Sequence, residues 1–154
     1  MAWLNEVVSR IDDICTTYEL KKIKTIGDAY MLCGGLSGDK TQAAENVIKA
    51  GIEMLEAVQS VPLACSDGNL NMRIGVHTGE LIAGVIGKRK FAYDVWGDVD
   101  NTASRIESTG IPGRIQISST TADLIREKFQ LKSRGNIPIK GKTEMELWLV
   151  RESL

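Results

Sequence analysis

The sequence predicts a single α/β or α+β domain over residues 1–154, built around a mixed sheet. Its 154 residues are 43% hydrophobic and 25% charged, which is typical of a globular chain that buries a core. Apolar residues recur three and four positions apart in some segments and alternate in others, so helices and strands interleave along the chain. No internal repeat is present, which excludes a solenoid or a propeller.

The first part of the chain predicts a helix, a hairpin and a second helix. Residues 3–18 place apolar side chains at helical spacing, with polar residues around the rest of the helix. The strand-forming runs KKIKTI and AYMLCGG flank Gly27 and Asp28, and such a pair favours a two-residue hairpin turn. Residues 39–58 again show helical spacing and predict the second helix.

The remainder of the chain predicts a second hairpin, two further helices and several strands. Alternating apolar residues indicate the strands, whereas polar starts followed by apolar stripes indicate the helices. Pro112 and Gly113 prevent the first of these helices from continuing. The expected elements are strand 70–76, hairpin 80–97, helix 98–108, strand 114–118, helix 119–129, strand 134–139 and strand 145–150.

Composition limits the partners of the chain. Nineteen Lys and Arg against twenty Asp and Glu leave a formal charge of −1, so the overall field favours neither nucleic acid nor an anionic membrane surface. The longest apolar run is far shorter than the roughly 20 residues that cross a bilayer. Cys15, Cys33 and Cys65 lack CxxC spacing and predict reduced thiols. We expect a cytoplasmic protein, or the cytoplasmic domain of a larger membrane-bound one, with no nucleic-acid partner and no membrane contact by this segment.

The sequence does not contain a complete P-loop or a nucleophile elbow. Gly141, Lys142 and Thr143 resemble the end of a phosphate-binding P-loop, but that pattern needs a glycine where the chain has Asn136. The following MELWLV predicts a strand, whereas a P-loop opens a helix. His77 is the only histidine and no GxSxG nucleophile elbow accompanies it, so a packed or surface role is favoured over a Ser-His-Asp triad.

Polar residues gather where the predicted strands and turns meet. Two lie four positions apart around the first hairpin turn, one interrupts an apolar strand run, two share a helix face, and one lies in a basic turn. Each alone also fits a plain structural role, such as turn chemistry, a solvated strand or an exposed helix face. The acid in the strand run fits least well, because it needs a partner if it is buried. The candidates are Lys24 and Asp28 around the hairpin turn, Asp94 in the strand run, Asn101 and Arg105 on the helix face, and Lys140 in the basic turn.

Three long segments in series resemble the catalytic domain of the class III nucleotidyl cyclases, the adenylyl and guanylyl cyclases. They are KIKTIGDAYM, MRIGVHTGELIAGVIG and YDVWGDVDNTASRIESTG, and the resemblance runs from about Trp3 to Arg151 in the same order and spacing. It implies a ferredoxin-like mixed sheet with helices packed on it. It also implies an enzyme of intracellular signal transduction that converts a nucleoside triphosphate to a 3′,5′-cyclic monophosphate and pyrophosphate.

The resemblance implies a role for each candidate residue. Asp28 matches a carboxylate ligand of the two Mg²⁺ or Mn²⁺ ions of the family, which prefer oxygen donors. Lys24 and Asp94 match the positions that recognise the base, where a lysine donates to adenine N1 and an aspartate accepts from the adenine amino group. Guanylyl cyclases usually have Glu and Cys there, so ATP is the implied substrate. The residues that match the ribose, α-phosphoryl and terminal-phosphate contacts are Asn101, Arg105 and Lys140 respectively.

Family members assemble each active site between two chains of a head-to-tail dimer. This chain carries Asp28 as well as the base, ribose and phosphate residues, which implies a homodimer with two shared sites. The family's first strand, with the pattern F-x-D-I-x-G-F-T and the other metal aspartate, does not precede Trp3. We therefore expect an N-terminally truncated domain that lacks one metal carboxylate and a central strand. Such a domain would be weakly active or inactive, and prone to domain swapping.

Two alternatives stay open at this point. A non-catalytic nucleotide-binding or dimerisation module would keep the cyclase fold without turnover. A guanylate cyclase would differ from an adenylate cyclase by few contacts to the base. The residues at positions 24 and 94 favour the adenylate cyclase.

Overall fold

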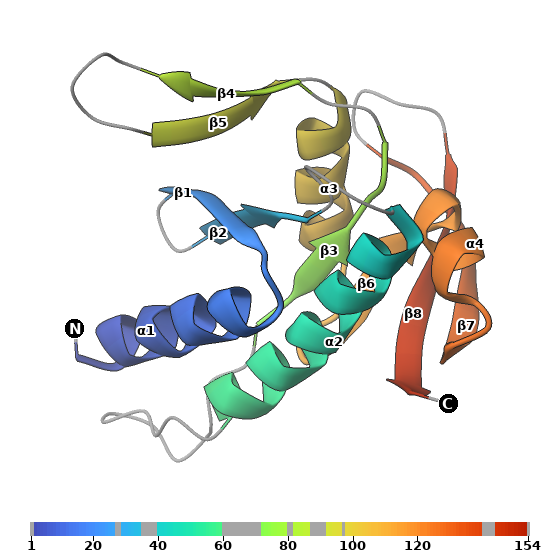
Figure 1. The fold of residues 1–154 in the computed structure, drawn as a ribbon. Coiled ribbons are helices and arrows are strands. Elements are labelled where there is room, and N and C mark those ends of the chain that lie inside the picture. Colours follow the sequence, from blue (N-terminus) through green and yellow to red (C-terminus); the bar gives the residue numbers. More distant parts are fainter. Residues whose placement is uncertain are drawn as a thin grey trace.

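Helices and strands interleave in the order that the sequence predicts (Figure 1). In the computed structural model the described residues are 2–26, 29–34, 40–59, 72–79, 82–86, 92–96, 98–139 and 144–153. The elements are α1 (Ala2–Thr17), β1 (Lys21–Ile26), β2 (Ala29–Cys33), α2 (Lys40–Gln59), β3 (Ile74–Val76), β4 (Ile82–Ile86), β5 (Ala92–Trp96), α3 (Asp98–Ser108), β6 (Ile115–Ser118), α4 (Ser119–Ile125), β7 (Phe129–Ile137) and β8 (Met145–Ser153).

The described strands form one four-stranded sheet and two hairpins. The sheet has the order β3-β6-β8-β7, in which β3 and β6 are parallel and the other neighbours are antiparallel. β1 pairs with β2 and β4 pairs with β5, both in antiparallel fashion. Helices pack on these strands, so the predicted α/β class with a mixed sheet is confirmed.

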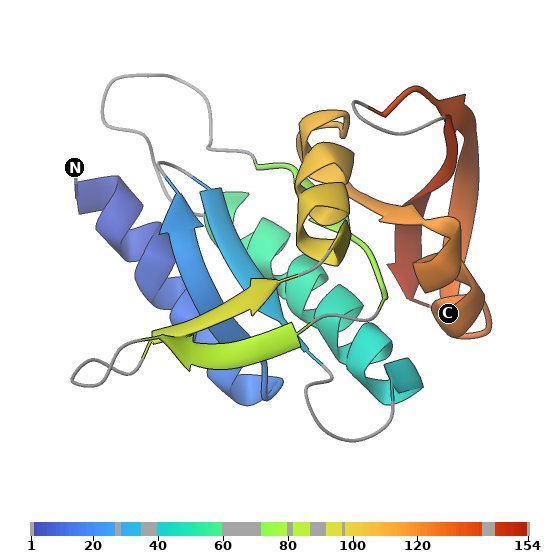
Figure 2. The same cartoon turned by 90° about the horizontal axis from the view of Figure 1, so that it is seen from above.

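The two hairpins are stacked on one another. Figure 1 shows the β1–β2 hairpin between β4–β5 and α1, and β1 contacts both β5 and α1. Seen from above, β4–β5 crosses the β1–β2 hairpin (Figure 2). This stacking joins segments that are far apart in the sequence.

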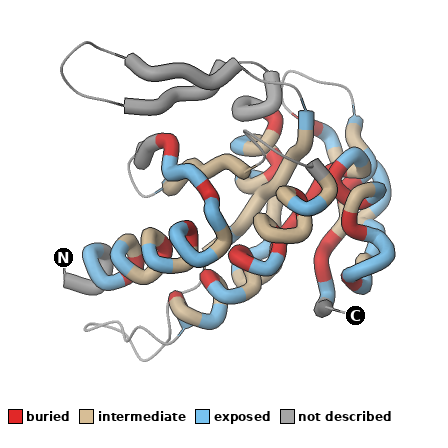
Figure 3. Tube along the Cα trace, viewed as in Figure 1, coloured by how far each residue is buried: buried red, intermediate tan, exposed pale blue. Residues whose placement is uncertain are grey.

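The helix α2 contributes to two parts of the hydrophobic core. Figure 3 shows buried and exposed residues alternating along it, as its apolar spacing predicts. Towards α1 and the β1–β2 hairpin, the buried residues are Val7, Ile11, Cys15, Leu20, Ala50, Met54 and Val58. Towards the four-stranded sheet and α4, they are Ala44, Ile48, Ile115, Ile117, Ala122, Ile125, Phe129 and Val150. α2 therefore connects the hairpin half of the fold to the sheet half.

Several element boundaries after residue 70 differ from the prediction. α4 ends at Ile125 rather than at residue 129, because Phe129 is buried as the first residue of β7. β7 thus begins before the predicted strand start at 134, and Gly135, with φ +75°, lies at an irregularity of the β7–β8 register that interrupts the alternation. β3 begins at Ile74 rather than at residue 70, and residues 60–71 lie outside the described part. β8 extends to Ser153.

The helix α3 lies directly on β3 at Gly75. A Cβ atom at Gly75 would be 2.3 Å from the Glu107 nitrogen and 2.8 Å from the Ala103 oxygen, which are backbone atoms of α3. The preceding residue, Ile74, has its side chain beside Gly51 of α2. Successive strand residues point to opposite faces, so α2 and α3 cover opposite faces of β3.

This close approach predicts that Gly75→Ala destabilises the fold. The added methyl group meets helix backbone that cannot rotate aside, and such overpacking typically costs about 1–3 kcal/mol of the free energy of unfolding. For a chain of this size the loss lowers Tm by roughly 2–4 °C per kcal/mol. Thermal unfolding followed by circular dichroism measures it.

Gly51→Ala is the matched control. A Cβ at Gly51 would meet the end of the Ile115 side chain at 3.0 Å, and that end can shift, while alanine favours the helix. We expect a Tm close to that of the wild type. A Gly75→Ala protein as stable as Gly51→Ala would contradict the close packing of α3 on β3.

Candidate functional site

Two predicted base-recognition residues lie on strands that are in contact. Lys24 is in β1 opposite Met31 of β2, next to an irregularity in the register between Lys22 and Lys24. Asp94 is in β5 opposite Gly84 of β4. β1 and β5 are in contact, at the place where the two hairpins cross in Figure 2. The fold therefore brings together the strands that carry Lys24 and Asp94.

The predicted metal ligand Asp28 belongs to the connection between β1 and β2 and lies outside the described residues. The flanking residues Ile26 and Ala29 pair across the hairpin, which confirms that a two-residue connection joins the strands. Within the described part of the chain, no group of three His, Cys, Asp or Glu side chains is arranged to hold a metal ion. The role of Asp28 as a metal ligand stays a prediction.

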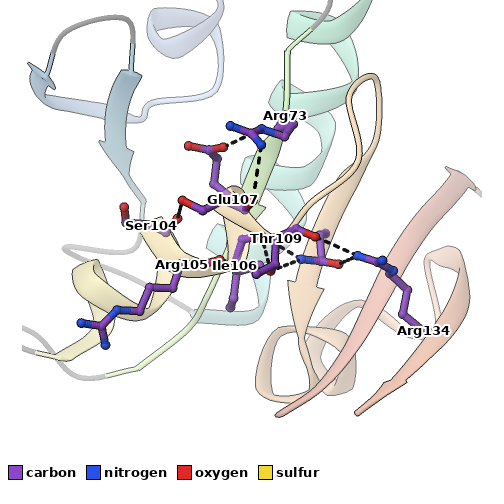
Figure 4. A network of polar contacts seen from close by, with 9 residues as sticks. Arg73, Ser104, Arg105, Ile106, Glu107, Thr109 and Arg134 are labelled. Atoms are coloured by element: carbon purple, nitrogen blue, oxygen red, sulfur yellow. Dashed lines mark hydrogen bonds and ion pairs between the residues drawn. The ribbon is translucent and has the colours of Figure 1, made fainter. Parts of the chain in front are cut away.

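Asn101 and Arg105 are one turn apart on α3, a helix that contacts both β3 and β5. The Arg105 side chain is partly exposed, and among the described residues its guanidinium makes no hydrogen bond or ion pair. Figure 4 shows this side chain extending away from the polar network at the end of the helix. A guanidinium with unused donors suits an anionic ligand such as a phosphoryl group.

Lys140 lies outside the described residues, but its neighbour Ile139 is placed. Ile139 is 2% exposed and forms a buried cluster with Ile106 and Leu147. Ile106 directly follows Arg105 in α3. The segment that leads to Lys140 therefore packs at the same place as the turn of α3 that carries Arg105.

A polar cluster attaches the β1–β2 hairpin to α1. The Tyr30 hydroxyl donates to Asp12 Oδ1 over 2.6 Å, and Lys22 Nζ lies 3.8 Å from the same oxygen and 5.0 Å from the centre of the Tyr30 ring. Burial, and next the hydrogen bond to Asp12, raise the pKa of the Tyr30 hydroxyl, so it remains a donor at neutral pH. This cluster fixes the strand that carries Lys24 relative to α1.

His77, Cys15 and Cys33 have structural roles, whereas Gly141, Lys142 and Thr143 lie outside the described residues. His77 follows β3, and its Nδ1 lies 2.7 Å from Oγ of Ser118, a hydroxyl too buried, at 1% exposure, to act as a nucleophile on a substrate. Cys15 and Cys33 are free thiols, as predicted, and burial raises the pKa of both. Cys65 lies outside the described residues. In the part of the chain that the structure describes, no helix combines the length and apolar character needed to cross a bilayer.

Comparison with known proteins identifies the family. A sequence model of the family described as "Adenylate and Guanylate cyclase catalytic domain" matches residues 1–152. This chain belongs to that family. The cyclase domain also shares its fold with the guanylate cyclase domain of RhGC from Catenaria anguillulae, solved in complex with GTP. The two have a TM-score of 0.90 and 32% sequence identity, and the match covers 100% of this chain and 84% of that one.

Curated relatives of the cyclase domain are longer proteins. It is 41% identical over 154 residues to atrial natriuretic peptide receptor 2 of Homo sapiens, which covers 97% of this chain and 15% of the receptor. It is 35% identical over 147 residues to the adenylate cyclase of Mycobacterium tuberculosis, which covers 95% of this chain and 33% of that enzyme. The chain thus spans less than half the length of both relatives. Adenylate and guanylate cyclases both occur among the matches, so family membership leaves the purine open.

The residues that hold the end of α3 are not among the candidates that the sequence predicts. Gln116 is a buried polar residue between Ile115 and Ile117, and this interruption of an apolar strand is the same signal that marks Asp94. Arg134, in β7, donates to the oxygen of Thr109, the residue directly after α3, and the sequence contains no local signal for that contact. Neither residue is among the predicted candidates, although the polar interruption at Gln116 is a signal that could have identified it.

The hydrogen bond between Tyr30 and Asp12 predicts a pH-dependent contribution to stability. Tyr30→Phe removes the donor but keeps the ring, and Asp12, whose side chain is 47% exposed, regains part of its hydration. We expect the free energy of unfolding to fall by about 1 kcal/mol at neutral pH. Because the pKa of Tyr30 is raised in the folded state, the contribution is complete below about pH 10, its ordinary value, and is lost as the pH rises further.

Urea unfolding of the wild type and Tyr30→Phe at a series of pH values measures this difference. The two stability curves should run parallel at neutral pH and converge in alkaline solution. Equal stability at neutral pH, or a gap that widens as the pH rises, would contradict the assigned hydrogen bond.

Proposed function

We propose that the domain is an adenylate cyclase that converts ATP to 3′,5′-cyclic AMP and pyrophosphate. In this reaction the ribose 3′-oxygen loses its proton and bonds to the α-phosphorus, while the bond from the α-phosphorus to the bridging oxygen of the β-phosphate breaks. Family membership supports the reaction class. The observation that carries the choice of substrate is the contact between β1 and β5, the strands of Lys24 and Asp94.

Lys24 and Asp94 suit the edge of adenine. A lysine offers only donors and an aspartate only acceptors, while adenine N1 accepts a hydrogen bond and the adenine amino group donates one. Guanine presents these groups in the opposite order, with a donor at N1 and an acceptor at O6. A buried polar group left without its partner costs about 1–3 kcal/mol, so this pair of side chains favours ATP.

In the proposed mechanism α3 provides the contacts to the ribose and the reacting phosphate. Asn101 orients the ribose, and Arg105 stabilises the charge that develops on the α-phosphoryl group in the transition state. The partly exposed guanidinium of Arg105, without a partner among the described residues, supports this role. Lys140 holds the terminal phosphates, and the packing of Ile139 with Ile106 supports its placement near Arg105.

Asp28 is the proposed ligand for Mg²⁺ or Mn²⁺. A carboxylate at a hairpin turn is an oxygen donor of the kind that these hard ions prefer, so this residue fits the group. When bound, the ion supplies Lewis-acid stabilisation of the phosphate charge.

Two further features belong to the proposal. It includes a homodimer with shared active sites, since one chain carries both the metal aspartate Asp28 and the base and phosphate residues. It also includes a cytoplasmic location, which the free thiols of Cys15 and Cys33 support.

Guanylate cyclase activity is the second candidate. The observation that favours it is the likeness to a guanylate cyclase domain solved with GTP. It predicts cyclic GMP from GTP, whereas the adenylate cyclase predicts cyclic AMP from ATP. A non-catalytic nucleotide-binding module would form neither product.

Arg105→Ala tests the proposed reaction in the full-length protein. We expect kcat for cyclic AMP formation to fall by about 10²- to 10³-fold, because the lost donor acts on charge in the transition state. The KM for ATP should change little. Steady-state assays with Mn²⁺ and ATP measure both constants.

Arg126→Ala is the matched control, since Arg126 pairs with Asp123 and lies over the Trp148 ring. We expect its kcat to equal that of the wild type. Formation of no cyclic nucleotide by the wild type would contradict the proposed activity. A loss in Arg105→Ala that appears in KM alone would contradict the role of Arg105.

A further inference from the structure

The end of α3 is held by side chains from β6, from β7 and from the residue just before β3 (Figure 4). The last carbonyl groups of a helix have no partner within the helix and need donors from elsewhere. Here the Ile106 oxygen accepts from Gln116 Nε2 over 2.7 Å. The oxygen of Thr109, the residue directly after the helix, accepts from Arg134 Nη1 over 2.9 Å. The Ser108 oxygen accepts from Arg73 Nη1 over 3.3 Å.

Gln116 is the centre of this network. Its residue is 0% exposed, so water cannot replace any of its hydrogen bonds. Nε2 donates to the Ile106 oxygen and, over 3.0 Å, to the Thr109 hydroxyl, while Oε1 accepts from Arg134. Both donors and the acceptor of the amide are therefore in use, and no other side chain of this size offers the same set.

Two arginines extend the network to both sides of Gln116. Arg134, from β7, donates to Gln116 and to the Thr109 backbone. Arg73, just before β3, pairs with Glu107 through Nε at 3.0 Å in addition to its bond to Ser108. Arg73 is 44% exposed, so its pair is the more hydrated and the weaker part of the network.

Arg105 is the residue directly before Ile106, whose carbonyl group accepts the hydrogen bond from Gln116. Figure 4 shows the Arg105 side chain extending to the side of α3 away from Arg134. The network thus holds the end of the helix on the side away from the Arg105 guanidinium, which takes part in none of its hydrogen bonds. A rotation or slide of the last turn would move the guanidinium directly, because Arg105 and Ile106 are consecutive residues of the same turn.

We infer that Gln116 and Arg134 are positioning residues for the cyclase reaction, which act by fixing the last turn of α3 so that Arg105 meets the α-phosphoryl group. The inference rests on the proposed role of Arg105. It goes beyond that role because it assigns the placement of the guanidinium to two residues that do not touch the substrate.

Gln116→Glu is the sharpest variant. It keeps the size of the side chain and its acceptor for Arg134, but replaces the donor that faces the Ile106 carbonyl with an acceptor. Misplacement of a catalytic group by about 1 Å can cost on the order of 10²-fold in rate, so we expect kcat to fall by about 10-fold or more. The KM for ATP should stay within about twofold of the wild type.

A double-mutant cycle with Arg105→Ala separates positioning from general damage. If Gln116 acts through Arg105, then Gln116→Glu lowers kcat in the wild type but has no further effect in Arg105→Ala. If it merely weakens the fold, the same factor appears in both backgrounds. The cycle is measured in the full-length protein, with Tm recorded for every variant.

Arg134→Met provides a second variant in case Gln116→Glu fails to fold, because Arg134 is only partly buried. It should show the same dependence on Arg105, and Arg134→Lys should recover part of kcat by restoring one charged donor. Arg10→Met is the matched control. Arg10 also donates to a helix-end carbonyl, that of Ala57 at the end of α2, but α2 carries none of the proposed site residues. Its kcat should be unchanged.

The outcomes separate the two proposals. If Arg105→Ala lowers kcat but the Gln116 and Arg134 variants do not, or do so equally in both backgrounds, the positioning role is wrong and the proposed function stands. If Arg105→Ala itself leaves kcat unchanged, both the proposed role of Arg105 and the positioning role are wrong.

Discussion

The carbonyl groups at the end of α3 impose the constraint on which the geometry of the proposed site depends. A helix can end against the interior of a protein only where donors meet its last carbonyl groups. Gln116 of β6, Arg134 of β7 and Arg73, just before β3, provide those donors. Gly75 then lets the helix backbone lie directly on β3. Together these contacts fix the position of α3, and with it the turn that carries Arg105.

The proposed site draws on both halves of the fold. Lys24 belongs to the hairpin that Tyr30 and Asp12 attach to α1, whereas Arg105 belongs to the helix that the sheet holds. α2 packs against both halves and so determines how they lie relative to one another. The β4–β5 hairpin, which contains Asp94, contacts β1 and leads into α3. It therefore connects the hairpin of Lys24 to the helix of Arg105.

Local patterns predict most of the elements, because an apolar face follows the period of its own helix or strand. They fail at Phe129, which continues the helical spacing of Ala122 and Ile125 but is buried at the start of β7, where tertiary packing prevails over periodicity. Spacing alone indicates the candidate polar residues, but only the resemblance of three segments to cyclases assigns their roles. The contacts of Gln116 and Arg134 with α3 join distant segments, so no local pattern contains them.

Exchange of the base-recognition residues tests most directly the central claim that Lys24 and Asp94 select the purine. The measurement is the ratio of kcat/KM for ATP to that for GTP, in the full-length wild type and in the double variant Lys24→Glu, Asp94→Cys. We predict that the wild type favours ATP and that the double variant shifts the ratio towards GTP by about 10²-fold or more, since two base contacts of about 1–3 kcal/mol each are reversed. A wild type that favours GTP, or a folded double variant with an unchanged ratio, would contradict the account.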